Sequence, residues 1–257
     1  MKNILQKGKL SRLEGGDSGK TFLLEFKGKR FVLRNYVDEK TATYYAKICR
    51  ELKGSVPKVF FQEQNKLLFE YVEGRDCTKA DALAVAARVG ELCARINKLP
   101  KQGLEEKLNI KKSVSLLKKH QLLTTDELNT AKELYLELKK KLRPTVSMDF
   151  DDVYPENFRL DKKGNIYLVD IECMEPKIKG SGIGKAFIKW FKTLEERKQF
   201  LKGYARIARP EFLTQDMLTF LYLHFLMGNM VHKIVRKKKQ NPKNPEVLRR
   251  ILRGGTV

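Results

Sequence analysis

The stretch from Gly15 to Phe22, GGDSGKTF, limits the possible folds most, because it is close to a phosphate-binding loop but is followed by the wrong elements. The pattern GxxxxGK[ST] requires a glycine five positions before Gly19, and that position holds Glu14. Such a loop also follows a buried strand and begins a helix. Here TFLLEF, KGK and RFVLR follow, which predicts a β-hairpin. We therefore do not expect a P-loop fold.

The rest of the pattern predicts a small strand-rich region followed by a larger helical region. Residues 1–73 contain the hairpin, a helix capped by Asp38 and stopped by Gly54, and two further strand candidates, VPKVFFQ and KLLFEYV. After residue 73, one hairpin, FRLDKKGNIYLVDIE, interrupts helical patterns. These patterns cover residues 79–99, 110–120, 126–142, 193–207 and 214–237. We expect an α+β fold with an N-terminal lobe at 1–73 and a C-terminal lobe at 74–257.

Cysteine usage and hydropathy indicate a reduced protein outside the membrane. The four cysteines form no CxxC pair, which gives no sign of a zinc site or a disulfide framework. The most apolar segment, MLTFLYLHFLMGNMV, contains His224, Gly228 and Asn229 and is too short to span a bilayer, so it predicts a buried helix. We expect a cytoplasmic localisation. Charged residues make up 33% of the chain and lysine dominates them, which fits a thermophile.

Two polar motifs have a spacing suited to phosphoryl transfer. In DVYPEN, Asp152 precedes Asn157 by five residues, and in YLVDIE, Asp170 follows Asn157 by thirteen residues with the second hairpin between them. Carboxylate and amide oxygens are ligands that Mg²⁺ accepts, and a carboxylate can also take a proton from an attacking hydroxyl. Earlier in the chain, Arg34 ends the strand FVLR and offers a charge for phosphate.

The order and spacing of these motifs resemble the protein-kinase-like superfamily, in its compact aminoglycoside-phosphotransferase, Bud-type and RIO-type branch. The resemblance extends from about Leu10 to Glu172. Within that branch, the size, the basicity and the DxE ending are similar to the archaeal RNA kinases that phosphorylate a 2′-hydroxyl of tRNA. The resemblance implies a two-lobed kinase-like fold, with ATP as phosphate donor and Mg²⁺ as cofactor.

The resemblance also implies roles for individual residues. Asp152 would orient or accept the proton of the attacking hydroxyl, while Asn157 and Asp170 would hold Mg²⁺. The remaining positions would bind the nucleotide. Gly15, Gly16 and Ser18 would cover the phosphates, and Arg34 would contact a phosphate, with Lys20 as the next candidate. The backbone of Glu70 and Val72 would pair with adenine, and Glu39, or else Glu51, would be the helix glutamate beside Arg34.

The sequence departs from the family pattern in three places. The triplet HRD or HGD is replaced by Phe150, Asp151 and Asp152, so the usual histidine is missing. Asp149 is an alternative catalytic aspartate, although it breaks the five-residue spacing. The motif DFG is replaced by DIE and no APE motif follows, which argues against a regulated activation segment.

Charge indicates the class of acceptor. Residues 1–73 carry a net charge of +6, so the remainder carries +16 of the total of +22. This excess would repel cationic acceptors such as aminoglycosides or choline, whereas it would attract RNA. We predict an ATP-dependent RNA kinase with tRNA as the expected RNA; the alternatives are a Bud- or RIO-like protein kinase and a non-catalytic RNA-binding pseudokinase. The predicted RNA contacts are Lys233, Arg236, Lys237, Lys238, Lys239, Arg249 and Arg250.

Overall fold

A computed structural model describes residues 4, 7–13, 21–101 and 108–255. The contacts divide the chain into two compact units: unit 1 comprises residues 1–78 and 155–172, and unit 2 comprises residues 79–154 and 173–257. The sequence placed a boundary at residue 73 and could not show that the segment 155–172 groups with unit 1. This segment does so because its first strand pairs with Gly74–Asp76.

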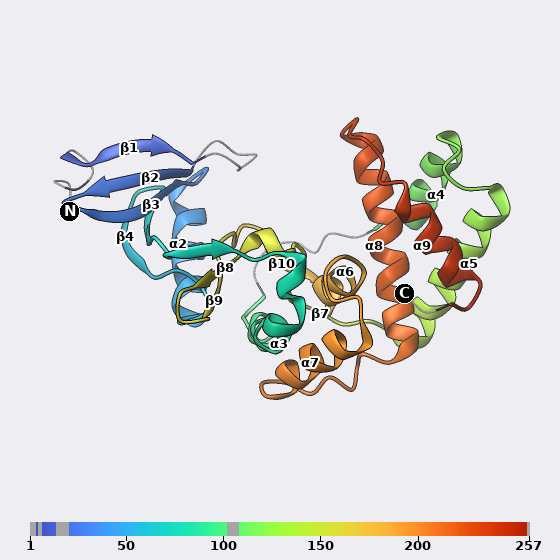
Figure 1. The fold of residues 1–257 in the computed structure, drawn as a ribbon. Coiled ribbons are helices and arrows are strands. Elements are labelled where there is room, and N and C mark those ends of the chain that lie inside the picture. Colours follow the sequence, from blue (N-terminus) through green and yellow to red (C-terminus); the bar gives the residue numbers. More distant parts are fainter. Residues whose placement is uncertain (1–3, 5–6, 14–20, 102–107, 256–257) are drawn as a thin grey trace. The chain divides into compact units, whose positions relative to one another are not determined.

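Unit 1 is built on a five-stranded antiparallel sheet (Figure 1). The turn that joins its second and third strands is tight, because Lys27 and Gly28 both have positive φ, as two-residue hairpin loops require. The predicted hairpin and the two later strands are confirmed. The first strand was not predicted, since its residues are all exposed and show no apolar alternation. In order of pairing, the strands are β1 (Lys9–Arg12), β2 (Thr21–Phe26), β3 (Lys29–Asn35), β5 (Lys66–Glu70) and β4 (Val59–Glu63).

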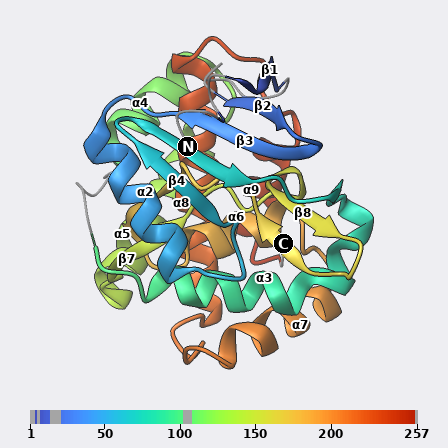
Figure 2. The ribbon, with the colours of Figure 1, turned by 90° about the vertical axis from the view of Figure 1, so that its left-hand side faces the viewer.

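One helix, α2 (Glu39–Glu51), packs against β4 and β5 of this sheet (Figure 2). Asp38 caps it by accepting a hydrogen bond of 2.7 Å from the Thr41 amide, as predicted. Unit 1 also contains a three-stranded antiparallel sheet, which includes the predicted second hairpin. Its members are β6 (Gly74–Asp76), β8 (Phe158–Asp161) and β9 (Ile166–Leu168), and the 3-10 turn η2 (Pro155–Asn157) precedes β8.

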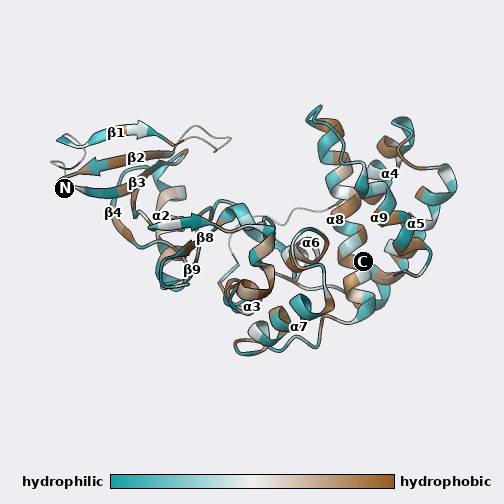
Figure 3. Ribbon diagram, viewed as in Figure 1, coloured by the Kyte–Doolittle hydropathy of each residue, from teal (hydrophilic) through white to brown (hydrophobic). Residues whose placement is uncertain are grey.

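Unit 2 is mainly helical, and the five predicted helical segments are confirmed. Its longest helix, α8, is buried along much of its length, and Figure 3 shows apolar residues along it. Among the described helices, none combines the length and apolarity that a bilayer span requires. The helices are α3 (Ala82–Asn97), α4 (Ile110–Lys119), α5 (Thr125–Leu142), α6 (Ser181–Lys189), α7 (Leu194–Ala205), α8 (Gln215–Val235) and α9 (Lys243–Leu252), and the 3-10 turn η1 (Lys79–Asp81) precedes α3.

Unit 2 also contains elements that the sequence pattern did not predict. The strands β7 (Val146–Phe150) and β10 (Met174–Ile178) form an antiparallel pair. Helix α6 was missed because it is only nine residues long and has glycine at positions 182 and 184, and glycine disfavours helix. Helix α9 was taken as part of a basic tail, because two prolines lie at its start.

Two helices of unit 2, α3 and α7, cross at glycines. A Cβ on Gly203 would lie 1.7 Å from the carbonyl oxygen of Ala87, and a Cβ on Gly90 would lie 2.0 Å from that of Phe200. These distances are far below van der Waals contact, so each glycine allows the two backbones to approach. Because α3 carries Asn97, which binds next to the candidate site described below, this packing also supports the site.

We predict that Gly203→Ala destabilises unit 2 by about 1–3 kcal/mol, because α7 must move away from α3 to admit the new methyl group. The matched control is Gly228→Ala in α8, where the described residues place only Leu108 near the added Cβ, at an ordinary 3.8 Å. That substitution should be neutral or slightly stabilising, since alanine favours helix more than glycine does. Urea unfolding of both variants measures the difference, and equal stabilities would contradict the close approach.

Candidate functional site

Arg34 lies near the end of β3 in unit 1, and carboxylates surround it. Its Nη1 donates to Asp170 Oδ1 at 3.3 Å, and its Nε lies 3.6 Å from Glu172 Oε1 and donates to Thr21 Oγ1 at 3.1 Å. Burial would lower the pKa of this guanidinium, but Asp170 and Glu172 raise it further than burial lowers it. Arg34 therefore stays charged and holds the carboxylate that was predicted to bind metal.

The predicted metal ligands, Asn157 and Asp170, are brought together by the hairpin of β8 and β9. The Val169 amide donates to the carbonyl oxygen of Asn157 at 2.9 Å, which joins the start of the hairpin to its end. Asp170 Oδ1 accepts from Arg34 and, at 3.4 Å, from the Glu172 amide. Within the described part of the chain, no hydrogen-bond donor is assigned to its Oδ2, and the side chain is 38% exposed.

This donor set fits Mg²⁺. One carboxylate and one amide oxygen are hard ligands, and Mg²⁺ is commonly held by one or two carboxylates together with phosphate oxygens and water. Across the described residues, no group of three or more His, Cys, Asp or Glu side chains could hold a metal ion alone. The arrangement therefore suits an ion that arrives with a phosphate ligand better than a permanent structural metal.

The expected pairing of Glu39 with Arg34 is wrong. Glu39 is exposed in the first turn of α2, directly after the cap residue Asp38. The carboxylates that pair with Arg34 are those of Asp170 and Glu172. Helix α2 reaches this segment through a tyrosine instead: the Tyr45 hydroxyl donates to the Glu172 carbonyl oxygen at 2.8 Å. The alternative, Glu51, is exposed on the last turn.

The segment predicted to bind adenine follows β5. The predicted contacts are the Glu70 carbonyl oxygen and the Val72 amide. The Glu70 amide donates to the Lys58 carbonyl oxygen at 2.8 Å, and no acceptor is assigned to the Val72 amide among the described residues. Tyr71 lies between two guanidinium groups, with Arg30 Cζ at 4.5 Å and Arg159 Cζ at 5.1 Å from its ring centroid. These contacts hold the segment in place, while its role in binding adenine stays a prediction.

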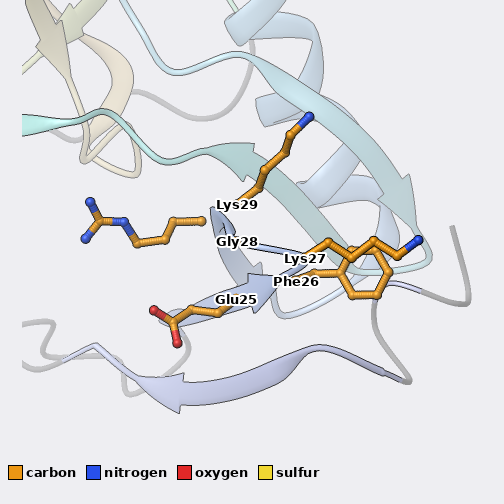
Figure 4. A pocket seen from close by; sticks show the side chains of 6 residues that line it. Glu25, Phe26, Lys27, Gly28 and Lys29 are labelled. Carbon is orange, nitrogen blue, oxygen red and sulfur yellow. The ribbon is translucent and has the colours of Figure 1, made fainter.

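Two further features concern the nucleotide-binding predictions. Gly15, Gly16, Ser18 and the alternative Lys20 lie outside the described residues, so their assignment stays a prediction. Figure 4 shows a hollow of about 420 Å³ around the β2–β3 turn, lined by residues 25–30. It contains none of the predicted site residues and lies at the opposite end of β3 from Arg34, so it is not the candidate site.

In unit 2, Asp152 pairs with a lysine that sequence analysis missed. Lys185 of α6 donates to Asp152 Oδ1 at 2.9 Å and lies 4.6 Å from the centroid of the Tyr154 ring. Burial lowers the pKa of Lys185, but Asp151, Tyr154 and Asp152 together raise it above its ordinary value. The Asp152 side chain is 32% exposed, so its carboxylate is accessible as well as paired.

Asp149, the alternative catalytic aspartate, has a structural position. It is buried on β7, and its two carboxylate oxygens accept hydrogen bonds from the Gly182 amide at 2.9 Å, the Gly180 amide at 2.8 Å and Asn97 Nδ2 at 3.1 Å. Burial raises the pKa of Asp149 to about 6, although these donors oppose the shift. The group is therefore mainly ionised at neutral pH, and its charge is used to bind the first turn of α6.

The glycines at the start of α6 allow this contact. A Cβ on Gly182 would lie 2.0 Å from the Phe150 carbonyl oxygen and 2.7 Å from Asp149 Oδ1. Because the helix N-terminus lies directly against β7, Lys185 on the next turn reaches Asp152. Asp149, Asn97 and the α6 amides together hold the strand that ends just before Asp151 and Asp152.

The predicted RNA contacts lie at the end of α8, in the turn after it and on α9. Lys233 is half-buried, and Arg236, Lys237, Lys238, Lys239 and Arg250 are exposed. Arg249 differs, because it forms an ion pair with Glu127 at 2.7 Å, and its charge lowers the pKa of that carboxyl. Arg249 is therefore less suited to a phosphate contact than the others.

Comparison with known proteins shows the fold. No family model and no curated protein sequence matches the chain. Among solved structures, the choline kinase LicA from Streptococcus pneumoniae has a TM-score of 0.66 at 16% identity, over 98% of this chain and 95% of that chain. An aminoglycoside phosphotransferase from Alicyclobacillus acidocaldarius has a TM-score of 0.66 at 12% identity, over 99% of this chain and 92% of that chain.

A third similar structure is the spectinomycin phosphotransferase APH(9)-Ia in complex with ADP and spectinomycin. Its TM-score is 0.62 at 13% identity, and the match covers 95% of this chain and 88% of that chain. The predicted α+β, two-lobed kinase-like fold class is confirmed, with an antiparallel sheet in the N-terminal region and helices in the C-terminal region.

We predict that Asp149→Asn lowers the free energy of unfolding by about 1–3 kcal/mol. The new side-chain NH₂ group would face a buried N–H donor that the carboxylate oxygen of Asp149 had accepted from, and that donor would lose its partner. Asp152→Asn should cost less, since its remaining oxygen still accepts from Lys185 and its side chain is 32% exposed. Denaturant unfolding at neutral pH compares the two variants. The structural assignment of Asp149 fails if Asp149→Asn is as stable as the unmodified chain.

Proposed function

We propose that this protein is an ATP-dependent phosphotransferase that transfers the γ-phosphate to a ribose 2′-hydroxyl of RNA, with tRNA as the expected acceptor. Support for phosphoryl transfer comes from Asp152, Asn157 and Asp170, which have the expected order and spacing on a kinase-like fold. The similar proteins LicA and APH(9)-Ia have been solved with AMP and with ADP, respectively. Nucleotide binding is therefore a property that this fold supports.

The proposal gives unit 1 the donor side of the reaction. Arg34 fixes one oxygen of Asp170, and in this proposal Mg²⁺ would bind the other oxygen of Asp170 and the side-chain oxygen of Asn157. Mg²⁺ held there would neutralise negative charge on the β- and γ-phosphates. Because Arg34 is already paired with two carboxylates, its main role in this proposal is to position Asp170, and phosphate contact is secondary.

The proposal gives unit 2 the acceptor side. Asp152 accepts the proton of the attacking hydroxyl while that oxygen forms its bond to the γ-phosphorus and the bond from phosphorus to the β-phosphate oxygen breaks. Lys185 holds Oδ1 of Asp152 at 2.9 Å, which orients the carboxylate so that the other oxygen can face the hydroxyl. The products are the phosphorylated acceptor and ADP.

The observation that carries the choice of acceptor is the net positive charge of the chain after residue 73, which holds most of the total of +22. Asp152 lies in this part of the chain and is paired there with Lys185. A cationic acceptor such as choline or an aminoglycoside would be repelled there, whereas RNA would be attracted. The fold relatives favour one other candidate, a small-molecule kinase, which would then need an acceptor that is not cationic.

Substitution of the predicted site tests phosphoryl transfer. With ATP labelled on the γ-phosphate and total RNA as acceptor, Asp170→Ala should abolish labelling, because Mg²⁺ loses its carboxylate. Asp152→Asn should also abolish labelling but should leave ATP affinity within about twofold, because its carboxylate faces the acceptor. Full activity in either variant would contradict the assignment. If the unmodified chain is also inactive, the result would support the pseudokinase alternative.

The nature of the labelled acceptor tests the rest of the proposal. Folded tRNA should take up label, and a copy with deoxyribose at the labelled nucleotide should not, because the 2′-hydroxyl is then missing. A mixture of proteins and one of small hydroxylated metabolites serve as competing acceptors. Label on protein alone would favour the Bud- or RIO-like alternative, and label on a metabolite alone would favour a small-molecule kinase.

Salt dependence tests the basic turn after α8. Changing Lys237, Lys238 and Lys239 together to glutamine should reduce the slope of log affinity for tRNA against log salt by about 2–3, because each phosphate contact contributes about 0.7–0.9. ATP affinity should not change. A matched control removes the same charge from exposed lysines of unit 1: Lys27, Lys29 and Lys47. Equal slopes for the two triple variants would show that the turn is not an RNA contact.

A further inference from the structure

Four other lysines of unit 2 act on the charge of Lys189 in α6. Burial lowers the pKa of Lys189, and repulsion from the other four lysines lowers it further. Among the described residues, no carboxylate forms an ion pair with its ammonium group; its one assigned side-chain partner is the amide of Asn244. The four neighbours, in order of their effect, are Lys185, Lys192, Lys233 and Lys79. Bringing like charges together costs free energy on folding, and a bound anion would offset that cost.

The geometry of Lys189 gives its ammonium a fixed place. Its Nζ lies 5.6 Å from the centroid of the buried Phe225 ring and donates to Asn244 Oδ1 at 3.2 Å. Asn244 is only 1% exposed, and its own Nδ2 donates to Asn229 Oδ1 at 2.8 Å, so the acceptor is itself held in place. A neutral amide uses one of the three N–H donors of the ammonium. Among the described residues, no other hydrogen-bond acceptor is assigned to this group.

Lys185 links this cluster to Asp152. Lys185 and Lys189 are four residues apart on α6, so they share one face and lie about 6 Å apart along the helix axis. Both ammonium groups lie over the same Phe225 ring, with Lys185 Nζ at 5.7 Å. Lys185 also contacts Asp152 at 2.9 Å. The charge of Lys189 therefore lies about one helical turn from Asp152, the carboxylate proposed to orient the acceptor.

We propose that Lys189, with Lys185 and Lys233, binds a phosphate group of the acceptor next to the hydroxyl that Asp152 orients. In RNA, each 2′-hydroxyl has a phosphodiester on the neighbouring 3′ carbon, so an acceptor bound in this way presents both groups together. The role of this phosphate rests on the proposed function, whereas the anion site rests on the geometry of unit 2 alone. Lys189 is a specificity residue in this proposal, and it takes no part in the transfer itself.

The first experiment detects the anion site without activity. The lysine side-chain carbons of the full chain are labelled with ¹³C, and Lys189→Arg identifies the Lys189 signal. Uridine 3′-monophosphate and inorganic phosphate are titrated at constant ionic strength, with uridine and chloride as controls. The Lys189 signal should shift saturably with the two phosphate compounds and not with the controls. Identical responses to phosphate and chloride would overturn the anion site.

The second experiment measures its effect on the acceptor. Lys189→Met keeps the apolar stem over Phe225 and removes the charge, so it should raise the KM for tRNA about tenfold, while kcat, the KM for ATP and the melting temperature stay close to normal. Lys189→Arg should restore most of the affinity. The matched control is Lys198→Met, which removes an exposed charge from α7 and should have no effect.

The two experiments separate the site from the proposed function. A saturable phosphate shift with no labelling of RNA would retain the anion site and reject the RNA acceptor. Labelling of RNA with no such shift, and with equal KM values for Lys189→Met and Lys198→Met, would retain the RNA kinase and reject the site. If Lys189→Met lowers the melting temperature and Lys189→Arg fails to restore tRNA affinity, Lys189 is structural and the proposal is wrong.

Discussion

The buried carboxylate of Asp149 is the contact on which the acceptor side of the molecule depends. It joins β7 to the first turn of α6 by accepting from two backbone amides, and Asn97 brings α3 to the same point. A carboxylate at a helix N-terminus is favoured by the helix dipole and by the unpaired amides there. Because α6 is held in this way, Lys185 and Lys189 project from a fixed helix, and Phe150 to Asp152 follow directly from a fixed strand. Removing one buried charge would therefore disturb both the orientation of Asp152 and the lysines beside it.

Unit 1 uses charge differently. The guanidinium of Arg34 and the carboxylates of Asp170 and Glu172 form a partly buried group, in which the positive charge holds the carboxylate that we propose as a metal ligand. A guanidinium suits this role better than an ammonium, because its planar donors can contact two acceptors at once. The family resemblance implies a lysine at position 34. The arginine found there suits the positioning of Asp170 better than direct binding of phosphate. The Tyr45 hydroxyl, in contact with Glu172, extends the same arrangement to α2.

Sequence analysis found what depends on local order and missed contacts between residues far apart in the chain. The hairpins, the capped helix after Asp38 and the spacing from Asp152 to Asp170 are all encoded within short stretches. Helix α6 was not predicted, since it is only nine residues long and glycine at positions 182 and 184 disfavours helix. Lys185 was missed because its partner, Asp152, lies 33 residues earlier in the chain. Glu39 was assigned by analogy with the family, whereas the pairing of Arg34 is decided by a hairpin that returns from residue 155 onward.

Charge that lies inside the fold is more informative about the acceptor than charge on its surface. Exposed lysines such as those after α8 increase solubility and are easily tolerated, so their number alone does not identify a ligand. Lys185 and Lys189 are different, because each is at least partly removed from water and Lys189 lacks a counter-charge among the described residues. A lysine in such a place lowers stability unless something compensates it. Retaining charge on this face of α6 is therefore best explained by an anion that arrives with the acceptor.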